Sequence, residues 1–450
     1  MIHKFSMNGI NIVLDVYSGA VHVVDDIVYS MLDHYDATSM EATIHRLKDR
    51  YLMEQLKEAY NEIKTLQEEG LLFTDDPYTE YIDFWDKQSV VKALCLHVAH
   101  DCNLRCKYCF ASAGSFEGKR GLMSSDIGKK AIDFVIANSG RRRNIEIDFF
   151  GGEPLMNFDV VRDIVEYAKE QGIRHGKVFR FTITTNGLLL NDEIKDYINE
   201  NMSNVVLSLD GTREVNDAMR VRMDGRGCYD DIVPKFIDIA ESRGQDNYYV
   251  RGTFTRKNLD FAKDVLHLAD LGFKQTSVEP VVAPEHEEYA LRKEDLPVLF
   301  KEYEKLAVEY ITRRKKNKGF NFFHFMLDLT QGPCVAKRLS GCGSGHEYLA
   351  VTPEGDIYPC HQFVGNKEFK MGNVMEGKLD SNIQKLFQKS NVYTKEKCRD
   401  CWAKFYCSGG CPANAYQFNK DINEPYFIGC ELEKKRVECA LMIKAALLLE

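Results

Sequence analysis

Apolar and polar residues alternate along three short runs at the start of the chain and later recur at helical spacing. The alternating runs are 3–7, 10–16 and 20–26. Period-two alternation predicts strands, and the Asn-Gly and Ser-Gly pairs between the runs favour tight turns. Runs with an apolar residue every three or four positions follow at 26–35, 39–51 and 52–70. Three strands followed by three helices predict a winged-helix-like domain over residues 1–75.

The pattern changes after a charged, tyrosine-rich stretch at 76–90, which we expect to be a linker. From there, apolar strand-like runs alternate with amphipathic helix-like runs. The strand-like runs are 91–99, 144–150, 178–185, 204–209, 248–255 and 275–282. This alternation predicts an α/β fold with a parallel sheet, and six units rather than eight predict a partial (βα)6 barrel over residues 91–315. Ligands of such sheets bind at the carboxyl ends of the strands.

Composition and charge narrow the class of protein. The 450-residue chain carries a net charge of −9, whereas a nucleic-acid-binding surface would be basic, so no nucleic acid is expected as a partner. The first residues show no secretion signal, and no apolar run reaches the roughly 18 residues of a membrane span. We therefore expect a cytoplasmic protein without a membrane partner, whose 14 cysteines serve as metal ligands rather than disulfides.

Three cysteines fall within eight positions just after the first strand-like run of the barrel. Cys102, Cys106 and Cys109 form a C-x3-C-x2-C pattern, here called the triplet. Structural zinc prefers four ligands, and a thioredoxin-like redox pair needs only C-x2-C. Three thiolates suit three irons of a cubane cluster and leave the fourth iron open for a small ligand that carries an amine and a carboxylate. A partial zinc site is the alternative.

The triplet, with an aromatic residue, Tyr108, before its last cysteine, resembles the signature loop of the radical S-adenosylmethionine (radical SAM) enzymes. The resemblance spans roughly residues 92–283. It implies that the triplet binds a 4Fe–4S cluster, which cleaves S-adenosylmethionine reductively to a 5′-deoxyadenosyl radical. The open iron then accounts for the odd number of thiols.

Further candidates for contacts with S-adenosylmethionine follow the second, third and fourth strand-like runs, and Tyr108 belongs with them. They are Gly151, Gly152, Glu153, Pro154, Thr184, Asn186, Ser208, Asp210 and Arg220. Glycines let a backbone approach a ligand closely, and the resemblance implies that the Gly-Gly-Glu-Pro segment binds the methionine ammonium. It also implies that Ser208 and Arg220 contact the ribose and the carboxylate. Structural roles are the alternatives, including a plain turn at the glycines and a helix cap at Asp210.

Nine of the cysteines follow Pro333, which predicts a separate Cys-rich module over residues 316–450. Their order resembles the SPASM extension of peptide-modifying radical SAM enzymes, which holds two auxiliary 4Fe–4S clusters. The resemblance implies a first auxiliary set of Cys342, Cys360 and Cys411, and a second auxiliary set of Cys398, Cys401, Cys407 and Cys430. With the triplet, this makes three 4Fe–4S clusters. A pair of zinc sites is the alternative.

Four cysteines remain outside these sets. Cys334 either completes the first auxiliary set or leaves that cluster with an open iron for a substrate thiolate. Cys95, Cys228 and Cys439 have no partner pattern, and we expect them to be buried free thiols.

The N-terminal strands and helices resemble the winged-helix element that captures the leader of a precursor peptide. The physical device would be strand addition to an exposed sheet edge. A DNA-reading winged helix is the alternative, but run 52–70 carries more carboxylates than lysines, which disfavours it. Residues 1–26 resemble the maturases of short Cys-rich peptides, the six-cysteines-in-forty-five class, which form thioether links.

The resemblance therefore implies an enzyme that joins cysteine sulfur to carbon within a ribosomally made Cys-rich peptide. Its partners would be that precursor, bound through its leader, and an external electron donor. Two alternatives stay open: a sulfatase-maturing or quinone-precursor type of SPASM enzyme, and a metal-binding protein without enzymatic activity.

Overall fold

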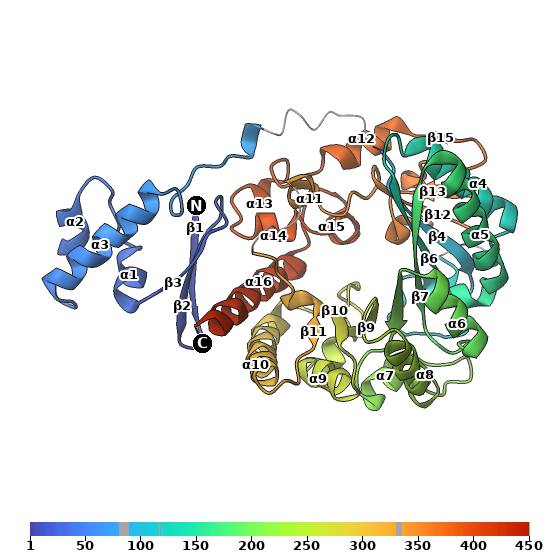
Figure 1. Ribbon diagram of the computed structural model, residues 1–450, viewed down its shortest axis with the longest axis horizontal. Helices are drawn as coiled ribbons and strands as arrows, with labels where there is room; N and C mark the ends of the chain where they lie inside the picture. The colour runs from blue at the N-terminus through green and yellow to red at the C-terminus, as the bar shows by residue number, and fades with distance from the viewer. Residues whose placement is uncertain (81–89, 117, 119, 330–334, 450) are drawn as a thin grey trace.

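The computed structural model describes residues 1–80, 90–116, 118, 120–329 and 335–449 (Figure 1). The first 80 residues lie at one end of the molecule and the helix-flanked parallel sheet lies at the other. The long C-terminal helix α16 (Phe427–Leu448) lies between them. None of the described helices combines the length and the apolar run that a membrane crossing requires.

The N-terminal unit contains the predicted three strands and three helices. They are β1 (Ile2–Met7), β2 (Ile10–Asp15), β3 (Val21–Val24), α1 (Asp26–Met31), α2 (Met40–His45) and α3 (Met53–Glu68). The strands form an antiparallel sheet in the order β1-β2-β3. Asn8 and Gly9 both adopt positive φ, as the tight turn between β1 and β2 requires. Ser39 caps α2, as its position predicts.

Both faces of the central strand β2 are buried. Val13 points to the side of helices α1–α3, where it packs with Val28 and Ile63. Ile12 and Leu14 point to the opposite side, where they belong to the main hydrophobic core, and β1 and β2 contact α16 there. The outer edge of β3 pairs with no strand among the described residues. The N-terminal unit is therefore docked on the rest of the protein with the outer edge of β3 unpaired, as is that of β1 in the part of the chain described.

Six parallel strands form the centre of the large sheet, in the order of the chain. They are β4 (Ala93–His100), β6 (Asn144–Gly151), β7 (Val178–Thr185), β8 (Asn204–Ser208), β9 (Tyr248–Phe254) and β10 (Gln275–Pro280). The helices that cover this sheet are α4 (Ser125–Asn138), α5 (Phe158–His175), α6 (Asp192–Asn201), α7 (Arg213–Met219), α8 (Tyr229–Ser242), α9 (Ala262–Asp270) and α10 (Leu296–Lys315). The predicted partial barrel is confirmed.

The sheet continues at both ends beyond the six predicted strands. β11 (Asn321–Phe322) joins β10 in parallel, and the short β5 (Gly121–Leu122) pairs with β4. On the other side, β12 (Tyr348–Val351) pairs in parallel with β4 and forms an antiparallel hairpin with β13 (Asp356–Tyr358). Two more short strands follow, β14 (Gly372–Asn373) and β15 (Lys378–Leu379). The Cys-rich module thus extends the barrel sheet.

The rest of the Cys-rich module is helical. Its helices before α16 are α11 (Val335–Ser340), α12 (Ser381–Lys389), α13 (Glu396–Arg399), α14 (Lys404–Cys407) and α15 (Pro412–Asn419). Of the predicted linker, residues 81–89 lie outside the described residues. Its beginning is held in place, because the Asp76 carboxylate accepts hydrogen bonds from the Tyr393 hydroxyl at 2.8 and 2.9 Å.

Candidate active site

A cavity of about 740 Å³ lies at the carboxyl ends of the barrel strands and extends to the Cys-rich module. The triplet lines it, together with most of the candidate cofactor contacts. Those candidates are Tyr108, Gly151, Gly152, Glu153, Thr184, Asn186, Ser208 and Arg220. Pro154 begins a short 3-10 turn, Pro154–Asn157, and is buried beside the cavity rather than in its wall. Most of the residues singled out from the sequence therefore line one cavity.

The triplet loop is hydrogen-bonded to the end of α7 and to the segment that follows it. Arg105 N–H donates to the Val221 carbonyl at 2.7 Å, and Lys107 N–H donates to the Met219 carbonyl at 2.9 Å. These two backbone bonds fix the middle of the loop between its first and last cysteines. The position of the triplet therefore depends on a segment more than one hundred residues later in the chain.

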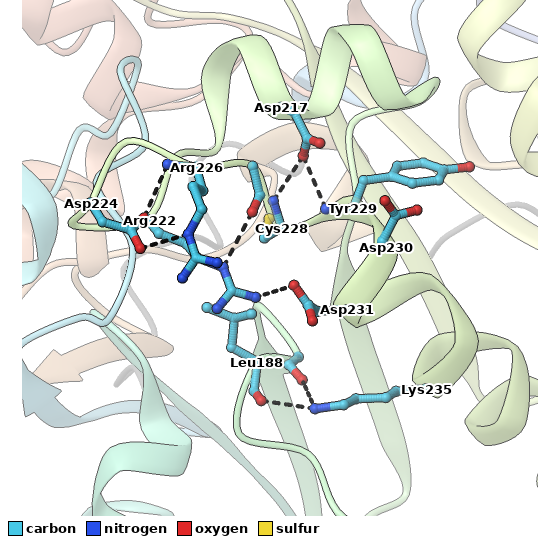
Figure 2. Close-up of polar contacts among 12 residues, drawn as sticks. Leu188, Asp217, Arg222, Asp224, Arg226, Cys228, Tyr229, Asp230, Asp231 and Lys235 are labelled. Atoms are coloured by element: carbon cyan, nitrogen blue, oxygen red, sulfur yellow. Dashed lines mark hydrogen bonds and ion pairs between the residues drawn. The ribbon is translucent and has the colours of Figure 1, made fainter.

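That supporting segment is itself stabilised by a polar network, which Figure 2 shows. The Asp217 carboxylate accepts hydrogen bonds from the backbone N–H groups of Cys228 and Tyr229, both at 2.9 Å. The Arg222 guanidinium donates to Asp231. A Cβ atom on Gly227 would lie 2.1 Å from Cγ of Asp217, so only glycine fits there. The sequence contains no signal that links this loop to the triplet.

The triplet thiols suit an iron–sulfur cluster chemically. Burial raises the pKa of Cys102 to about 11 and that of Cys106 to about 12, so a bound metal is needed to keep them ionised at neutral pH. Leu104 N–H points at Cys102 Sγ from 3.4 Å, and Asn186 Nδ2 lies 3.7 Å from the same sulfur. Hydrogen bonds to sulfur of this kind tune cluster potentials.

The two glycines after β6 are required by close backbone packing. Gly151 has φ +137°, and a Cβ there would lie 2.2 Å from the Ala99 carbonyl oxygen. A Cβ on Gly152 would lie 2.0 Å from the Asp101 carbonyl oxygen. Gly152 N–H donates to Ala99 O at 2.7 Å. The glycines therefore bring the end of β6 against the start of the triplet loop.

Glu153 is buried and anchors the end of β7. Its carboxylate accepts hydrogen bonds from the Thr185 hydroxyl at 2.7 Å, from Asn186 N–H at 2.8 Å and from Leu155 N–H at 3.1 Å. Burial raises its pKa to about 7, although these three bonds oppose the shift. The side chain thus joins the ends of two strands where the sequence predicts an ammonium contact.

Tyr108, Asp210 and Arg220 form a second buried network under the triplet. The Tyr108 hydroxyl donates to Asp210 Oδ2 at 2.6 Å, and Arg220 Nε lies 3.0 Å from Asp210 Oδ1. The Arg220 guanidinium also lies over the Tyr108 ring, 5.6 Å from its centroid. Asp210 does not cap α7, whose N-cap is Thr212, and it is fully buried outside the cavity wall. It contacts two side chains that line the cavity, those of Tyr108 and Arg220.

Electrostatic interactions link several thiols of the Cys-rich module to one another. Cys360 interacts electrostatically with Cys342 and Cys411, and Cys430 does so with Cys398 and Cys401. Burial raises the pKa of Cys430 to about 11. Within the described part of the chain, no three His, Cys, Asp or Glu side chains are arranged around one metal ion.

The membership of the two auxiliary sets stays a prediction. Cys407 interacts with Cys398, Cys401 and Cys430, as a member of the second auxiliary set would. Cys334 lies outside the described residues, so its role in the first set is not defined.

Several cavity-lining residues were not singled out from the sequence as site residues. They are Asp148, Arg251, Tyr348 and His361, and Cys95, which was expected only as a buried thiol. Cys95 and Asp148 occupy inward positions of β4 and β6. Period-two counting along each strand would have placed them on the lumen face. Cys228 and Cys439 are buried, as expected.

Two family models match parts of the chain. The radical SAM superfamily model matches residues 96–269, which include the triplet and all the predicted cofactor contacts. The SPASM model, described as an iron–sulfur cluster-binding domain, matches residues 342–402. That segment includes Cys342, Cys360, Cys398 and Cys401 and ends before the later cysteines.

Individual proteins are similar to this chain over longer stretches. The cysteine-type anaerobic sulfatase-maturating enzyme of Clostridium novyi (strain NT) is 26% identical over 360 residues, covering 75% of this chain and 92% of the relative. The structure of native anSMEcpe with bound AdoMet superposes with a TM-score of 0.66 at 20% identity, covering 80% of this chain and all of that one. Both similarities leave part of the chain unmatched.

A third similarity extends further along the chain. The structure of Streptococcus suis SuiB bound to the precursor peptide SuiA has a TM-score of 0.52 at 17% identity and covers 94% of this chain and 97% of that chain. Coverage of this extent includes most of the first 80 residues, because a match without them would be much shorter. The shared fold thus includes the N-terminal unit.

Proposed function

We propose that this chain, a radical SAM/SPASM enzyme related to the anaerobic sulfatase-maturating enzymes, forms thioether cross-links in a ribosomally made Cys-rich precursor peptide. The proposal joins three parts of the molecule: the open strand edge of the N-terminal unit, the central cavity and the thiols around it. One observation carries the proposal: the N-terminal sheet packs against helix α16, and residues of the same helix line the cavity.

The leader of the precursor would add to the sheet at β3. The outer edge of β3 has no strand partner among the described residues, and its Val23 side chain is 44% exposed. Leu71, at the end of α3, is also exposed, and its carbonyl lies 3.0 Å from Nε2 of His22 in β3. An extended peptide could pair its backbone with this edge and place alternate side chains on the two faces of the sheet, beside Val23 on one face and His22 on the other.

The cavity would hold the cofactors and the segment to be modified. We assign a 4Fe–4S cluster to Cys102, Cys106 and Cys109, and S-adenosylmethionine to the strand ends that carry Gly151–Glu153, Thr184, Asn186 and Ser208. The chemistry that this pair supplies when bound is removal of a hydrogen atom from carbon. The enclosing walls exclude water and hold the peptide carbon and sulfur near each other.

The thiols of the Cys-rich module would hold two auxiliary 4Fe–4S clusters. Cys360 is buried, whereas Cys342 and Cys411 are exposed in the part of the chain described. A first set with only these three ligands has room for a peptide thiolate as the fourth. An external protein would supply the electron that starts each turnover.

Two features favour cross-linking over the sulfatase-type oxidation of a single side chain. The C. novyi relative covers 75% of this chain, whereas the peptide-bound SuiB structure covers 94%, including the leader-binding region proposed here. Thiols of the Cys-rich module also line the cavity that would receive the peptide. The sulfatase-type reaction is the second candidate, because the relative is named for it.

Tandem mass spectrometry of reacted peptides tests the proposal. The cluster-reconstituted enzyme, S-adenosylmethionine and a reductant are incubated with a Cys-rich precursor. A thioether removes one hydrogen from sulfur and one from carbon, and it leaves the cysteine unreactive to alkylation. Conversion of cysteine to an aldehyde with loss of sulfur would instead establish the sulfatase-type reaction and contradict cross-linking.

A further inference from the structure

Three neighbouring strands carry a row of polar side chains across the lumen of the barrel. Cys95 of β4 is paired in register with Asp148 of β6, and Asp148 is paired with Thr182 of β7. All three line the central cavity, and the Thr182 side chain hydrogen-bonds to the Asp148 carboxylate. None of these residues belongs to the cofactor contacts proposed above.

The row lies deeper in the barrel than the cofactor contacts. Gly151 follows Asp148 by three positions on β6, and Thr184 follows Thr182 by two positions on β7. Because parallel strands run toward the cofactor end together, the polar row lies below that end. It therefore faces the part of the cavity that remains for a substrate.

Asp148 is a carboxyl group without a cationic partner in the described structure, and burial together with the nearby Glu146 raises its pKa to about 7. The titratable groups that face it are Cys95 from β4, Tyr348 from β12 and Glu146 on its own strand. A carboxyl in this setting exchanges a proton near neutral pH.

The row also reaches the thiols of the first auxiliary set. Cys95, Tyr348 and Cys360 pack together in one cluster with Phe150. Tyr348 interacts electrostatically with Cys95, Asp148 and Cys360. Asp148 is thus separated from Cys360 by a single layer of side chains.

A second cavity lies at the far end of the barrel. It has a volume of about 370 Å³ and is lined by Glu146, Arg180, Asp246 and Tyr249, among others. Thr182 lines both this lower cavity and the central one. The Thr182 side chain, which hydrogen-bonds to Asp148, therefore lies between that carboxylate and the lower cavity.

We propose that Asp148 accepts the proton released by the peptide cysteine when its sulfur is prepared for bonding to carbon, and returns that proton to solvent past Thr182 and Glu146. The role rests on the proposed cross-linking function. The S–H bond breaks, its electron pair stays on sulfur, and the proton forms an O–H bond with the Asp148 carboxylate. No oxidant or reductant takes part in this step.

The test is Asp148→Asn, which keeps the shape of the side chain and an oxygen that accepts from Thr182. We expect cross-linking at pH 7 to fall by about a hundredfold, the usual size of a lost acid–base contribution. Formation of 5′-deoxyadenosine with peptide should persist. Cross-linking by the variant should recover above roughly pH 8.5, where a free cysteine thiol ionises by itself.

Two neighbours provide controls. Tyr348→Phe and Cys95→Ala alter side chains that face Asp148 without removing its carboxylate. Each variant should therefore keep its rate of cross-linking within a few-fold of the wild type at pH 7. Infrared difference spectra of the full-length protein between pH 6 and pH 8 should contain a protonated-carboxyl component that Asp148→Asn removes and the two controls retain.

The outcomes separate this role from the proposed function. A wild-type enzyme that cleaves S-adenosylmethionine but cross-links no cysteine peptide would overturn the function, and the role of Asp148 with it. A wild-type enzyme that cross-links, alongside an Asp148→Asn variant with the same rate and pH profile, would overturn the role alone. A pH-independent loss in the variant would also overturn it, since that result marks a structural defect.

Discussion

Gly152 shows how a single missing side chain positions a metal-binding loop. A Cβ atom on Gly152 would lie 2.0 Å from the oxygen and 2.5 Å from the carbon of the Asp101 carbonyl, which are both backbone atoms. A backbone carbonyl at the end of a strand cannot move aside as easily as the end of a flexible side chain can. Substitution at Gly152 must therefore push the triplet loop away from β6.

We expect Gly152→Ala to destabilise the protein by about 1–3 kcal/mol, as overpacking does, and to lower the iron content of the triplet site. Thermal unfolding and iron analysis measure the two effects. Gly121→Ala is the matched control, because nothing lies within 4 Å of the Cβ it would add. Equal stability and iron content in the two variants would show that the loop accommodates the extra atom.

A second expectation at this scale concerns the triplet thiols. Cys106→Ala should abolish formation of 5′-deoxyadenosine, because three thiolates are the minimum ligand set proposed for that cluster. Iron bound by the Cys-rich module should remain. Cys439→Ala serves as the control, since this buried thiol in α16 belongs to neither auxiliary set. Continued 5′-deoxyadenosine formation by Cys106→Ala would contradict the assignment.

Asp15 ties the end of β2 to the residues that leave the N-terminal unit. Its buried carboxylate accepts hydrogen bonds from Ser18 N–H at 2.9 Å, from Thr74 N–H at 3.1 Å and from the Thr74 hydroxyl. Burial raises the pKa of this carboxyl, but the hydrogen bonds outweigh burial and hold it below its ordinary value. The charged form is therefore the one that stabilises the fold.

The Asp15→Asn variant should be less stable than the wild type by about 2 kcal/mol at pH 7, the usual contribution of hydrogen bonds to a charged group. Because the folded-state pKa is depressed, this advantage is complete above about pH 4, the unfolded value, and is lost as pH falls through the folded value. Thermal unfolding from pH 7 to pH 3 checks this. A difference between the two proteins that stays constant over the range would refute the account.

At the scale of elements, the proposed binding of a leader to β3 leads to a prediction about the backbone of the peptide rather than its side chains. Strand addition uses only alternate N–H groups of the incoming peptide, because successive residues point to opposite edges. Leader peptides carrying one N-methyl group each, moved along the binding segment, should therefore lose affinity at every second position. Fluorescence anisotropy measures the binding. Equal affinity at all positions would exclude pairing with the β3 edge.

Local sequence patterns predicted the helices and strands well, but they did not predict which distant strands pair with each other. The alternation of apolar strand-like runs with amphipathic helix-like runs predicted the six barrel strands, and the triplet follows the first of these runs directly. The pairing of β12 with β4 was missed, because a hairpin pattern does not say which sheet edge it joins. The network of Tyr108, Asp210 and Arg220 was missed for the same reason, since it joins three separate loops.

For the whole molecule, the three proposed clusters predict about twelve irons per assembled chain, four for each cubane. Anaerobic iron and sulfide analysis measures this number. Cys401→Ala should lower it by about four while leaving 5′-deoxyadenosine formation in place, because the triplet lies in another part of the fold. Bound zinc, or about four irons in the wild type, would contradict the two auxiliary clusters.

The double use of α16 bounds the distance that a bound peptide has to span. The N-terminal sheet meets this helix at Glu438, whose carboxylate lies 3.1 Å from His3 of β1, and Cys430 lines the cavity eight positions earlier. Eight helical residues span about 12 Å, and β3 lies two strands beyond β1, about 10 Å further. The straight distance cannot exceed the sum of these two, and an extended residue spans about 3.3 Å. A spacer of about seven residues between a leader docked at β3, as proposed, and the first cysteine is therefore long enough for that cysteine to reach the cavity.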